Sequence, residues 1–151
     1  MRVFRVADRR FPIFDGTGAG LIGGRWSSPG RSVIYAAETF AGALLEVLVH
    51  SSLGRLPKMH AAIEIHIPDS VAVESIDGRG LPGWDAEDQL ASRAFGDEWL
   101  GTRRSAVLLV PSVVMRGRER NVLINPKHPA FAQIVAGEPQ DVEWDKRLFK
   151  R

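Results

Sequence analysis

Residues 23–50, GGRWSSPGRSVIYAAETFAGALLEVLVH, are the stretch around which this 151-residue chain is organised. The stretch contains an arginine that follows two glycines (Arg25), a tyrosine that closes a short apolar run (Tyr35) and a carboxylate inside an apolar segment (Glu46). A cation, an aromatic ring and an anion on three neighbouring structural elements indicate the parts of one pocket. We therefore predict that the rest of the chain builds and covers this pocket.

The second half of the stretch predicts a helix. Thr39 is a suitable N-cap, the helix extends to about His50 or Ser52, and Gly54 follows as a stop signal. Apolar residues cover most of its circumference, which predicts a helix buried on nearly all sides. Gly42, Glu46 and His50 form the remaining row at i, i+4 and i+8. This row is either a pocket wall, in which Gly42 leaves room above the carboxylate, or simply the solvent-facing stripe.

The first half of the stretch predicts a β-hairpin. Arg25 and Trp26 fall on a short strand, residues 28–31 (SPGR) make a turn, and residues 32–36 (SVIYA) form a second strand. A hairpin of this kind would set Arg25 and Tyr35 near each other.

The glycine-rich residues 15–24 (DGTGAGLIGG) predict a loop that can approach a ligand closely. Within it, Gly18, Gly20 and Gly23 satisfy the GxGxxG pattern of dinucleotide-binding folds. That pattern is meaningful only between a strand and a helix, and the flanking segments FPIFD and RWSSPG favour neither. We therefore reject a Rossmann-type fold.

The remaining chain predicts further strands and helical turns. Strands are expected at residues 2–6, 61–68, 70–76, 104–114, 121–125 and 142–149, a helix at 84–100 and one or two helical turns at 131–135. Pro111 must end the pairing of its strand, which places Ser112 where the strand leaves the sheet. A hydroxyl there is either a ligand contact or an ordinary turn serine. Together these elements predict an α+β fold, a single domain over residues 1–151 with a mixed β-sheet core and flanking helices.

Composition narrows the functional classes. Lysine and arginine number 20 against 18 acidic residues, and arginine, which dominates, prefers bidentate contacts to phosphates and carboxylates. This bias fits a phosphate-bearing ligand, an acidic partner or RNA, and equally a solvated surface. The absence of cysteine excludes disulfides, zinc thiolates and thiol nucleophiles. Without an apolar run of signal-peptide or membrane-spanning length, we expect a soluble cytoplasmic protein that does not enter a membrane.

Several chemistries lack the residues that they need. The histidines at His50, His60, His66 and His128 show no metal-binding spacing, so no metal site is expected. Ser112 lies outside any GxSxG motif, and the chain contains no P-loop. The candidate residues that remain are one carboxylate (Glu46), one arginine (Arg25) and one tyrosine (Tyr35). Such a set suits cleavage at an anomeric carbon, because a carboxylate can stabilise an oxocarbenium-like centre or activate the attacking nucleophile.

Several motifs, in this order along the chain, resemble those of the RES domain family: GGRW around Arg25, YAAE from Tyr35, the Leu-Glu pair ending at Glu46, VPS ending at Ser112 and NVLINPKHP from Asn121. The family takes its name from an arginine, a glutamate and a serine, which correspond here to Arg25, Glu46 and Ser112. The resemblance extends over nearly the whole chain, although residues 53–102 carry no motif that aligns.

The resemblance implies a fold similar to ADP-ribosyltransferases and the toxin of a bacterial toxin–antitoxin pair that consumes NAD+. The implied partner is an Xre-type helix-turn-helix antitoxin that covers the active site and represses the shared operon, so that DNA is contacted only through the antitoxin. NAD+ is then a substrate, and no cofactor is expected. Whether the chain forms a homo-oligomer stays open.

On this basis we predict cleavage of the nicotinamide–ribose bond of NAD+. Arg25 would hold a phosphate or the adjoining ribose, Tyr35 would pack on the nicotinamide or ribose, and Glu46 would bind the ribose hydroxyls and stabilise charge at the anomeric carbon. Ser112 and Asn125 would help to fix the substrate. The acceptor is open: water gives a glycohydrolase, phosphate a phosphorylase, and a protein side chain an ADP-ribosyltransferase.

Two other functional classes remain as alternatives. An RNA-cleaving toxin would hold RNA with the arginine tracts around Arg103 and Arg116, although these tracts lack the interleaved aromatic residues of a stacking platform. A non-enzymatic module would use the same pocket only to bind a partner peptide.

Overall fold

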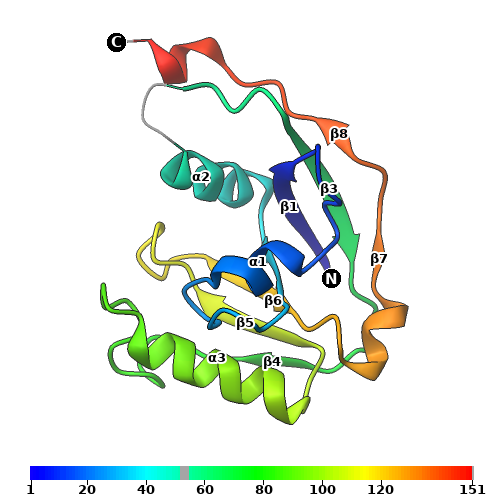
Figure 1. The fold of residues 1–151 in the computed structure, drawn as a ribbon, viewed down its shortest axis with the longest axis vertical. Coiled ribbons are helices and arrows are strands. Elements are labelled where there is room, and N and C mark those ends of the chain that lie inside the picture. The colour runs from blue at the N-terminus through cyan, green and yellow to red at the C-terminus, as the bar shows by residue number, and fades with distance from the viewer. Residues whose placement is uncertain (52–54, 151) are drawn as a thin grey trace.

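The computed structural model describes residues 1–51 and 55–150, which form a mixed β-sheet with flanking helices (Figure 1). In chain order the elements are β1 (Arg2–Asp8), α1 (Thr17–Ile22), β2 (Ile34–Ala37), α2 (Phe40–His50), β3 (His60–His66), β4 (Val73–Ser75), α3 (Leu90–Thr102), β5 (Val107–Pro111), β6 (Arg120–Ile124), a 3-10 helix (Pro129–Gln133), β7 (Val135–Ala136), β8 (Gln140–Asp141) and a second 3-10 helix (Lys146–Phe149). The expected α+β fold with a mixed sheet and flanking helices is confirmed.

The sheet is joined narrowly in its middle. In the described part of the chain the strands follow the order β4-β5-β6-β2-β1-β3-β7, with β8 beside β3, and the β4–β5 pair is parallel. Strand β1 pairs with β3 along its whole length, whereas it meets β2 at one register position, Phe4 opposite Ala37. The two halves of the sheet therefore separate between β1 and β2, and Figure 1 shows them running in different directions.

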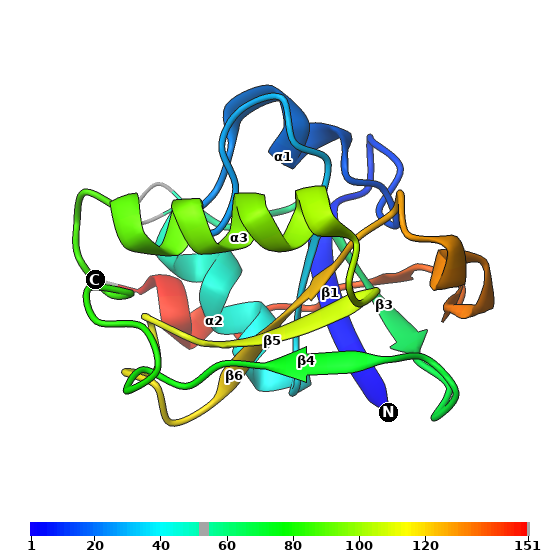
Figure 2. The same cartoon turned by 90° about the horizontal axis from the view of Figure 1, so that it is seen from below.

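The core is centred on β5 and β6, as the unbroken apolar run of β5 predicts. All five residues of β5 are buried. Because side chains alternate along a strand, Leu108 and Val110 pack with Trp99 of α3, while Val107 and Leu109 join a second cluster with residues of β1 and β3. Figure 2 shows α3 lying along this half of the sheet.

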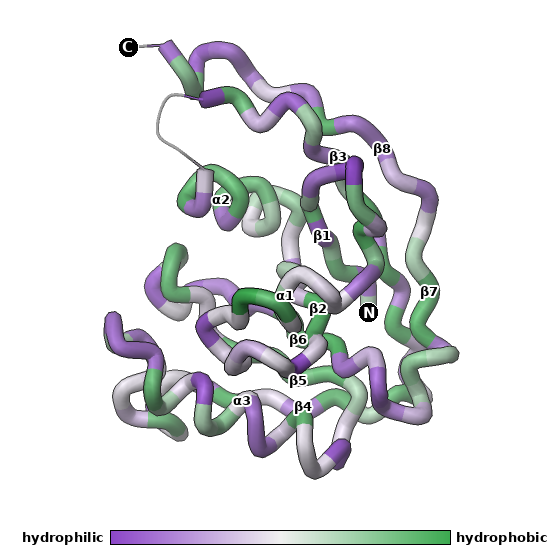
Figure 3. Tube along the Cα trace, viewed as in Figure 1, coloured by the Kyte–Doolittle hydropathy of each residue, from purple (hydrophilic) through white to green (hydrophobic). Residues whose placement is uncertain are grey.

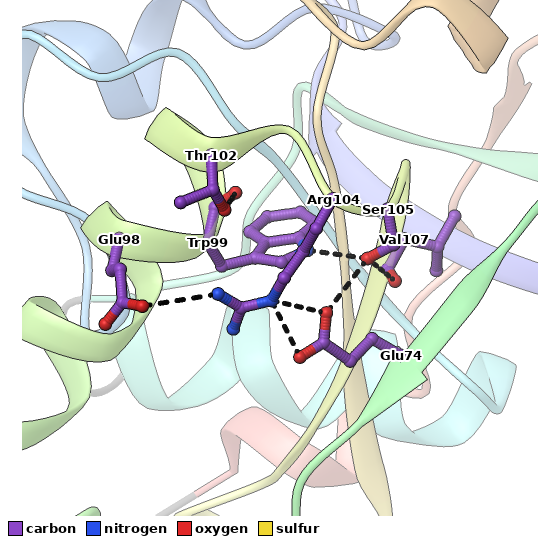
Figure 4. Close-up of polar contacts among 7 residues, drawn as sticks. All are labelled: Glu74, Glu98, Trp99, Thr102, Arg104, Ser105 and Val107. Atoms are coloured by element: carbon purple, nitrogen blue, oxygen red, sulfur yellow. Dashed lines mark hydrogen bonds and ion pairs between the residues drawn. The ribbon is translucent and has the colours of Figure 1, made fainter.

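Polar contacts fasten the end of α3 to the edge strand β4 (Figure 4). The buried indole Nε1 of Trp99 donates to Ser105 Oγ at 2.8 Å, and Ser105 Oγ lies 3.3 Å from Glu74 Oε2. Arg104 Nε also donates to Glu74, at 2.9 Å, and Arg104 Nη1 lies 3.4 Å from Glu98 Oε1. Arg104 is thus paired with acidic side chains within the fold. Less positive charge in the tract around Arg103 is therefore available to hold RNA.

Replacing Trp99 with phenylalanine should destabilise the protein by about 2 kcal/mol, because a buried hydrogen bond is lost and a small void is left. The measurement is the free energy of unfolding in urea. Trp144→Phe serves as the matched control, since that indole is only partly buried and donates to the carbonyl of Pro57. An equal loss in both variants would show that the Trp99 contact carries no special weight.

Three of the predicted elements are wrong. Arg25 and Trp26 form no strand: only an isolated bridge joins Gly24 to Ser27, and β2 instead pairs with β1 and β6. The expected loop at residues 15–24 contains α1. No strand forms at residues 142–149: Lys146–Phe149 form a 3-10 turn, which the Asp145 side chain caps by accepting from the backbone N–H of Arg147.

The helix predicted at residues 84–100 begins later, at Leu90. Residues 84–89 form turns, and Gln89 has a left-handed backbone with φ 59°. The carbonyls of Trp84 and Ala86 accept hydrogen bonds from the Arg25 side chain, and the Ala86 carbonyl also accepts from the backbone N–H of Gln89 in a turn. A tertiary contact therefore replaces the first predicted turn of the helix.

Helix α2 starts as predicted, with Thr39 Oγ1 accepting from the backbone N–H of Gly42, and ends at His50. The expected stop signal at Gly54 lies outside the described residues. The helix is not buried on nearly all sides: Val49 is 57% exposed, and of its residues only Gly42 and Ala43 are buried. Figure 3 shows that α2 is mostly hydrophobic with a few hydrophilic residues, whereas α1 is hydrophobic at one end only. No helix in the described ranges is long and apolar enough to cross a membrane.

Candidate active site

A cavity of about 550 Å³ opens where the two halves of the sheet separate. Its walls come from β1, α1, the loop after α1, β2, α2 and the start of β6. The polar residues that line it are Arg5, Arg25, Tyr35, Glu46, His50, Gln89 and Asn121. The cavity therefore collects three of the residues predicted for the site, Arg25, Tyr35 and Glu46, although the predicted hairpin is absent.

Glu46 is held in one orientation by two donors. Ser112 Oγ donates to Glu46 Oε1 at 2.9 Å, and Asn121 Nδ2 donates to the same oxygen at 2.8 Å. Both described donors thus bind one carboxylate oxygen and leave the other for a ligand. Of the two interpretations of the Gly42, Glu46 and His50 row, the pocket wall is the correct one for Glu46, which is partly buried and lines the cavity. His50 also lines the cavity but is exposed, so both interpretations apply to it.

Gly42 has a different function from the one expected. A Cβ at Gly42 would lie 3.1 Å from the Met115 side chain and 3.2 Å from that of Glu119. The missing side chain therefore lets the β5–β6 turn pack against the start of α2. Thr39 Oγ1, which also donates to Glu119 at 2.8 Å, strengthens this contact.

Ser112 holds the Glu46 carboxylate from a buried position outside the cavity. It is fully buried, and its hydroxyl accepts from the backbone N–H of Met115 at 3.2 Å while donating to the carboxylate. Pro111 ends β5, as predicted, and so sets Ser112 at the point where the chain turns towards α2. The structure brings Ser112 to the site as a residue that fixes Glu46, without placing it on the cavity wall.

Asn125 does not reach the cavity, and Asn121 takes the expected place of an asparagine there. The Asn125 side chain is buried, donates to the carbonyl of Leu100 at 3.3 Å and accepts from the N–H of Lys127. The two asparagines are four positions apart in extended chain, a distance of roughly 13 Å. Strand β6 begins beside the end of β5, and Asn121 pairs with Val110. Because the sequence places Ser112 at the end of β5, an antiparallel pairing of the two strands would have indicated Asn121, at the start of β6, as its neighbour.

Replacing Asn121 with alanine should lower turnover of the substrate roughly 10- to 100-fold, because Glu46 would lose one of the two donors that orient it. Asn121→Asp should cost more, since a second negative charge would face the carboxylate. Activity per folded protein is the quantity to measure, and Asn125→Ala is the comparison. A larger loss in Asn125→Ala than in Asn121→Ala would contradict this assignment.

Arg25 stands on a loop that passes directly over Tyr35. Its Nη1 donates to the carbonyls of Trp84 at 3.2 Å and Ala86 at 2.9 Å. A Cβ at the preceding residue, Gly24, would lie 2.6 Å from the Tyr35 hydroxyl oxygen, so only glycine allows this approach. The GGRW motif thus places Arg25 near Tyr35 by close packing instead of by a hairpin.

Tyr35 binds the loop with its hydroxyl. The phenol oxygen accepts from the backbone N–H of Trp26 at 3.1 Å and shares a hydrogen bond of 2.8 Å with Ser27 Oγ. Burial raises the pKa of Tyr35, so the phenol stays neutral at physiological pH. The ring lines the cavity, which keeps a stacking role available to it.

Arg5 is a cavity residue that the sequence did not indicate. Its Nε donates to the carbonyl of Ile13 and its Nη1 to that of Tyr35, each at 2.7 Å. Burial lowers the pKa of Arg5, although the guanidinium stays charged. The described hydrogen bonds of Arg5 go to neutral carbonyls, while the carboxylate of Asp15 is close enough to raise its pKa. Arg5 therefore brings to the cavity a positive charge that Asp15 offsets only in part.

Comparison with known proteins assigns the family. A family model described as RES domain matches residues 2–145. The chain belongs to the RES domain family. This RES domain is 41% identical, over 140 residues, to the Prs ADP-ribosylating toxin of Sphingobium sp. (strain YBL2), a match that covers 90% of this chain and 86% of that protein.

Two further relatives are named Toxin Res. The protein from Pseudomonas putida (strain KT2440) is 38% identical over 136 residues, covering 89% of this chain and 91% of its own length. The protein from Yersinia enterocolitica is 32% identical over 153 residues, covering 98% and 99%. Both relatives are thus matched over most or nearly all of their own length.

The fold also resembles a solved structure. A chain in the crystal structure of the M. tuberculosis MbcT-MbcA toxin-antitoxin complex superposes with a TM-score of 0.77, covering 93% of this RES domain and 83% of that chain. At 17% identity this likeness shows a shared fold.

Among residues 1–51 and 55–150, no group of three or more histidine or acidic side chains could hold a metal ion.

Proposed function

We propose that this RES domain is a toxin that cleaves the nicotinamide–ribose bond of NAD+. The observation that carries the proposal is the Glu46 carboxylate, which Ser112 and Asn121 fix through one oxygen inside a cavity lined by two arginines. A fixed anion in a half-enclosed pocket stabilises positive charge that develops at an anomeric carbon. Pre-orientation matters here, because the carboxylate need not reorganise as the bond breaks.

The charges of the cavity fit a dinucleotide with a diphosphate. Arg5 and Arg25 approach it from β1 and from the loop after α1, while Glu46 approaches from α2. Guanidinium groups bind phosphate oxygens, and a carboxylate binds ribose hydroxyls. The volume of about 550 Å³ lies within the range of small-molecule and cofactor sites. In this arrangement the arginines hold the diphosphate and Glu46 meets the nicotinamide ribose.

The reaction requires no general acid. Nicotinamide leaves as a neutral molecule from a positively charged ring, so the bonding electrons stay with the departing nitrogen and no proton is needed. Tyr35, neutral because it is buried, is suited to stack on the nicotinamide or ribose and not to donate a proton. The buried Oδ1 of Asn121 has no protein hydrogen-bond partner in the described ranges.

Transfer to a protein is the second candidate reaction. It is favoured by the name of the Sphingobium relative, an ADP-ribosylating toxin, at 41% identity. Cleavage of the same bond supplies the ADP-ribosyl group in either case, so Glu46 has the same task whether water, phosphate or a protein side chain attacks. The acceptor thus separates a glycohydrolase, a phosphorylase and a transferase that share one first step.

The proposed partner is a cognate antitoxin of the Xre helix-turn-helix type. This chain would then contact DNA only through the antitoxin. The naming of two relatives as Toxin Res supports the toxin role, and the cytoplasm is its proposed location. The cavity mouth supports a covering partner, because Ile22 of α1 and Val49 of α2 line it and are 78% and 57% exposed. Exposed apolar residues at a polar cavity are suited to burial by another protein.

Product identification tests the proposal and the acceptor together. The protein is incubated with NAD+ in buffer, with added phosphate, and with a bacterial lysate cleared of its own NAD+-consuming activity. Mass spectrometry then distinguishes free ADP-ribose, ADP-ribose phosphate and ADP-ribosylated protein. Release of nicotinamide in at least one arm is expected. Intact NAD+ in all three arms would contradict the proposed function.

A further inference from the structure

The loop that carries Arg25 is held along one side by α3. Ser92 Oγ donates to the carbonyl of Arg25 at 2.7 Å, and Arg93 Nε donates to the carbonyl of Gly24 at 2.9 Å. These bonds fix the backbone on which Arg25 stands. The guanidinium is fixed separately, by two carbonyls of the turns that precede α3.

Helix α3 approaches the same loop most closely at Gly96. A Cβ at Gly96 would lie 1.7 Å from the carbonyl oxygen of Trp26, far inside the contact distance of two heavy atoms. Any side chain at this position must push either the loop or the helix away. Glycine in a helix interior is otherwise unfavourable, so the close approach explains its presence in the middle of α3.

Asp97, the next residue of α3, fixes the end of the loop. Its Oδ1 accepts from the backbone N–H of Ser28 at 2.9 Å, and its Oδ2 accepts from Ser28 Oγ at 2.6 Å. A carboxylate that accepts both donors of one serine holds that residue in one orientation. The loop is thus bound at Gly24, Arg25 and Ser28 by one face of one helix.

We infer that Ser92, Gly96 and Asp97 of α3 are positioning residues that set the place of Arg25 opposite Glu46. The inference rests on the proposed function, in which Arg25 holds the phosphates of the substrate. It gives a role to part of residues 53–102, the segment that carries no motif that aligns with the family. Displacement of Arg25 by about 1 Å is enough to lower catalytic efficiency roughly 100-fold.

Two glycines of α3 provide a matched pair of variants. Gly96→Ala should lower kcat/KM for NAD+ roughly 100-fold, mainly through KM, because the new methyl group displaces the loop. Gly101→Ala adds the same methyl group to the same helix, where it would meet only the movable end of Arg31 at 3.3 Å. Its kcat/KM should stay within about twofold of the wild type, since a flexible side chain can move aside. Equal effects of the two substitutions would overturn the inference.

Asp97 variants keep the test independent of any folding defect in Gly96→Ala. Asp97→Ala removes both bonds to Ser28 without a steric clash and should raise KM. Asp97→Asn should restore most of the loss, because its amide oxygen still accepts from the Ser28 N–H and its NH₂ can donate to the hydroxyl. In an Arg25→Ala background, Asp97→Ala should cause little further loss. A full additive loss there would show that Asp97 does not act through Arg25.

Hydrogen exchange separates failure of this inference from failure of the proposed function. The amide of Ser28 should exchange faster in Asp97→Ala than in the wild type, while the amides of β5 stay equally protected. This measurement needs no NAD+. If the wild type leaves NAD+ intact but Ser28 exchange accelerates, the proposed function fails and the role of α3 in holding the loop stands. Unchanged exchange at Ser28 would overturn the role of α3.

Discussion

Glu46→Gln is expected to abolish NAD+ cleavage, lowering kcat at least about 1000-fold, while the protein stays folded. The amide cannot stabilise a positive anomeric carbon, because it has no net charge. Its oxygen can still accept from Ser112 and Asn121, which are the two donors that bind Glu46 Oε1. The substitution therefore removes the charge and keeps the hydrogen bonds that hold the side chain.

Glu64→Gln is the control for this experiment. Glu64 lies on β3, its side chain is 52% exposed, and it pairs with Arg2 away from the cavity. Removing its charge should leave kcat within about twofold, since an exposed ion pair contributes little. Turnover is followed by nicotinamide release, and circular dichroism confirms the fold. Full activity of Glu46→Gln would remove this carboxylate from the reaction.

Arg5→Met should weaken NAD+ binding roughly 10- to 100-fold, because a charge-assisted contact to phosphate is worth about 1.5–3 kcal/mol. The same change should lower the free energy of unfolding by about 3 kcal/mol, since the carbonyls of Ile13 and Tyr35 lose their donor. Arg5→Lys keeps the charge and should bind NAD+ more tightly than Arg5→Met. Calorimetry measures binding, and urea titration measures unfolding.

Arg2→Met provides the matched control on the same strand. The Arg2 side chain is 67% exposed and faces Glu64. Its removal should change neither NAD+ affinity nor stability by a measurable amount. If Arg5→Met bound NAD+ as tightly as Arg2→Met, the assignment of Arg5 as a phosphate-binding residue would be wrong.

Patterns of local periodicity and capping predicted much of the fold. The alternation from Arg2 onward predicted β1, the apolar run before Pro111 predicted a central strand, and Thr39 marked the start of α2. These features depend on neighbours in the sequence, which is why they can be read from it. The three residues that name the family, Arg25, Glu46 and Ser112, were also found by resemblance, and Glu46 and Ser112 are in direct contact.

The missed features depend on tertiary contacts. Arg5 reads as one polar residue of an alternating strand, and only the separation of β1 from β2 exposes it to the cavity. Glu46 lies on a helix whose apolar residues suggested full burial, whereas Val49 on the same helix is exposed at the cavity mouth. The predicted strand at residues 121–125 puts Asn121 and Asn125 on the same face, so strand periodicity alone could not choose between them.

Nicotinamide release tests the central claim most directly. Proton NMR follows NAD+ mixed with purified wild-type protein or with Glu46→Gln at equal concentration, and resolves free nicotinamide from nicotinamide bound in NAD+. Resonances of free nicotinamide should grow with the wild type and stay absent with Glu46→Gln. Equal release by both proteins, or intact NAD+ with the wild type in the presence of phosphate and of protein acceptors, would contradict cleavage by the Glu46 carboxylate.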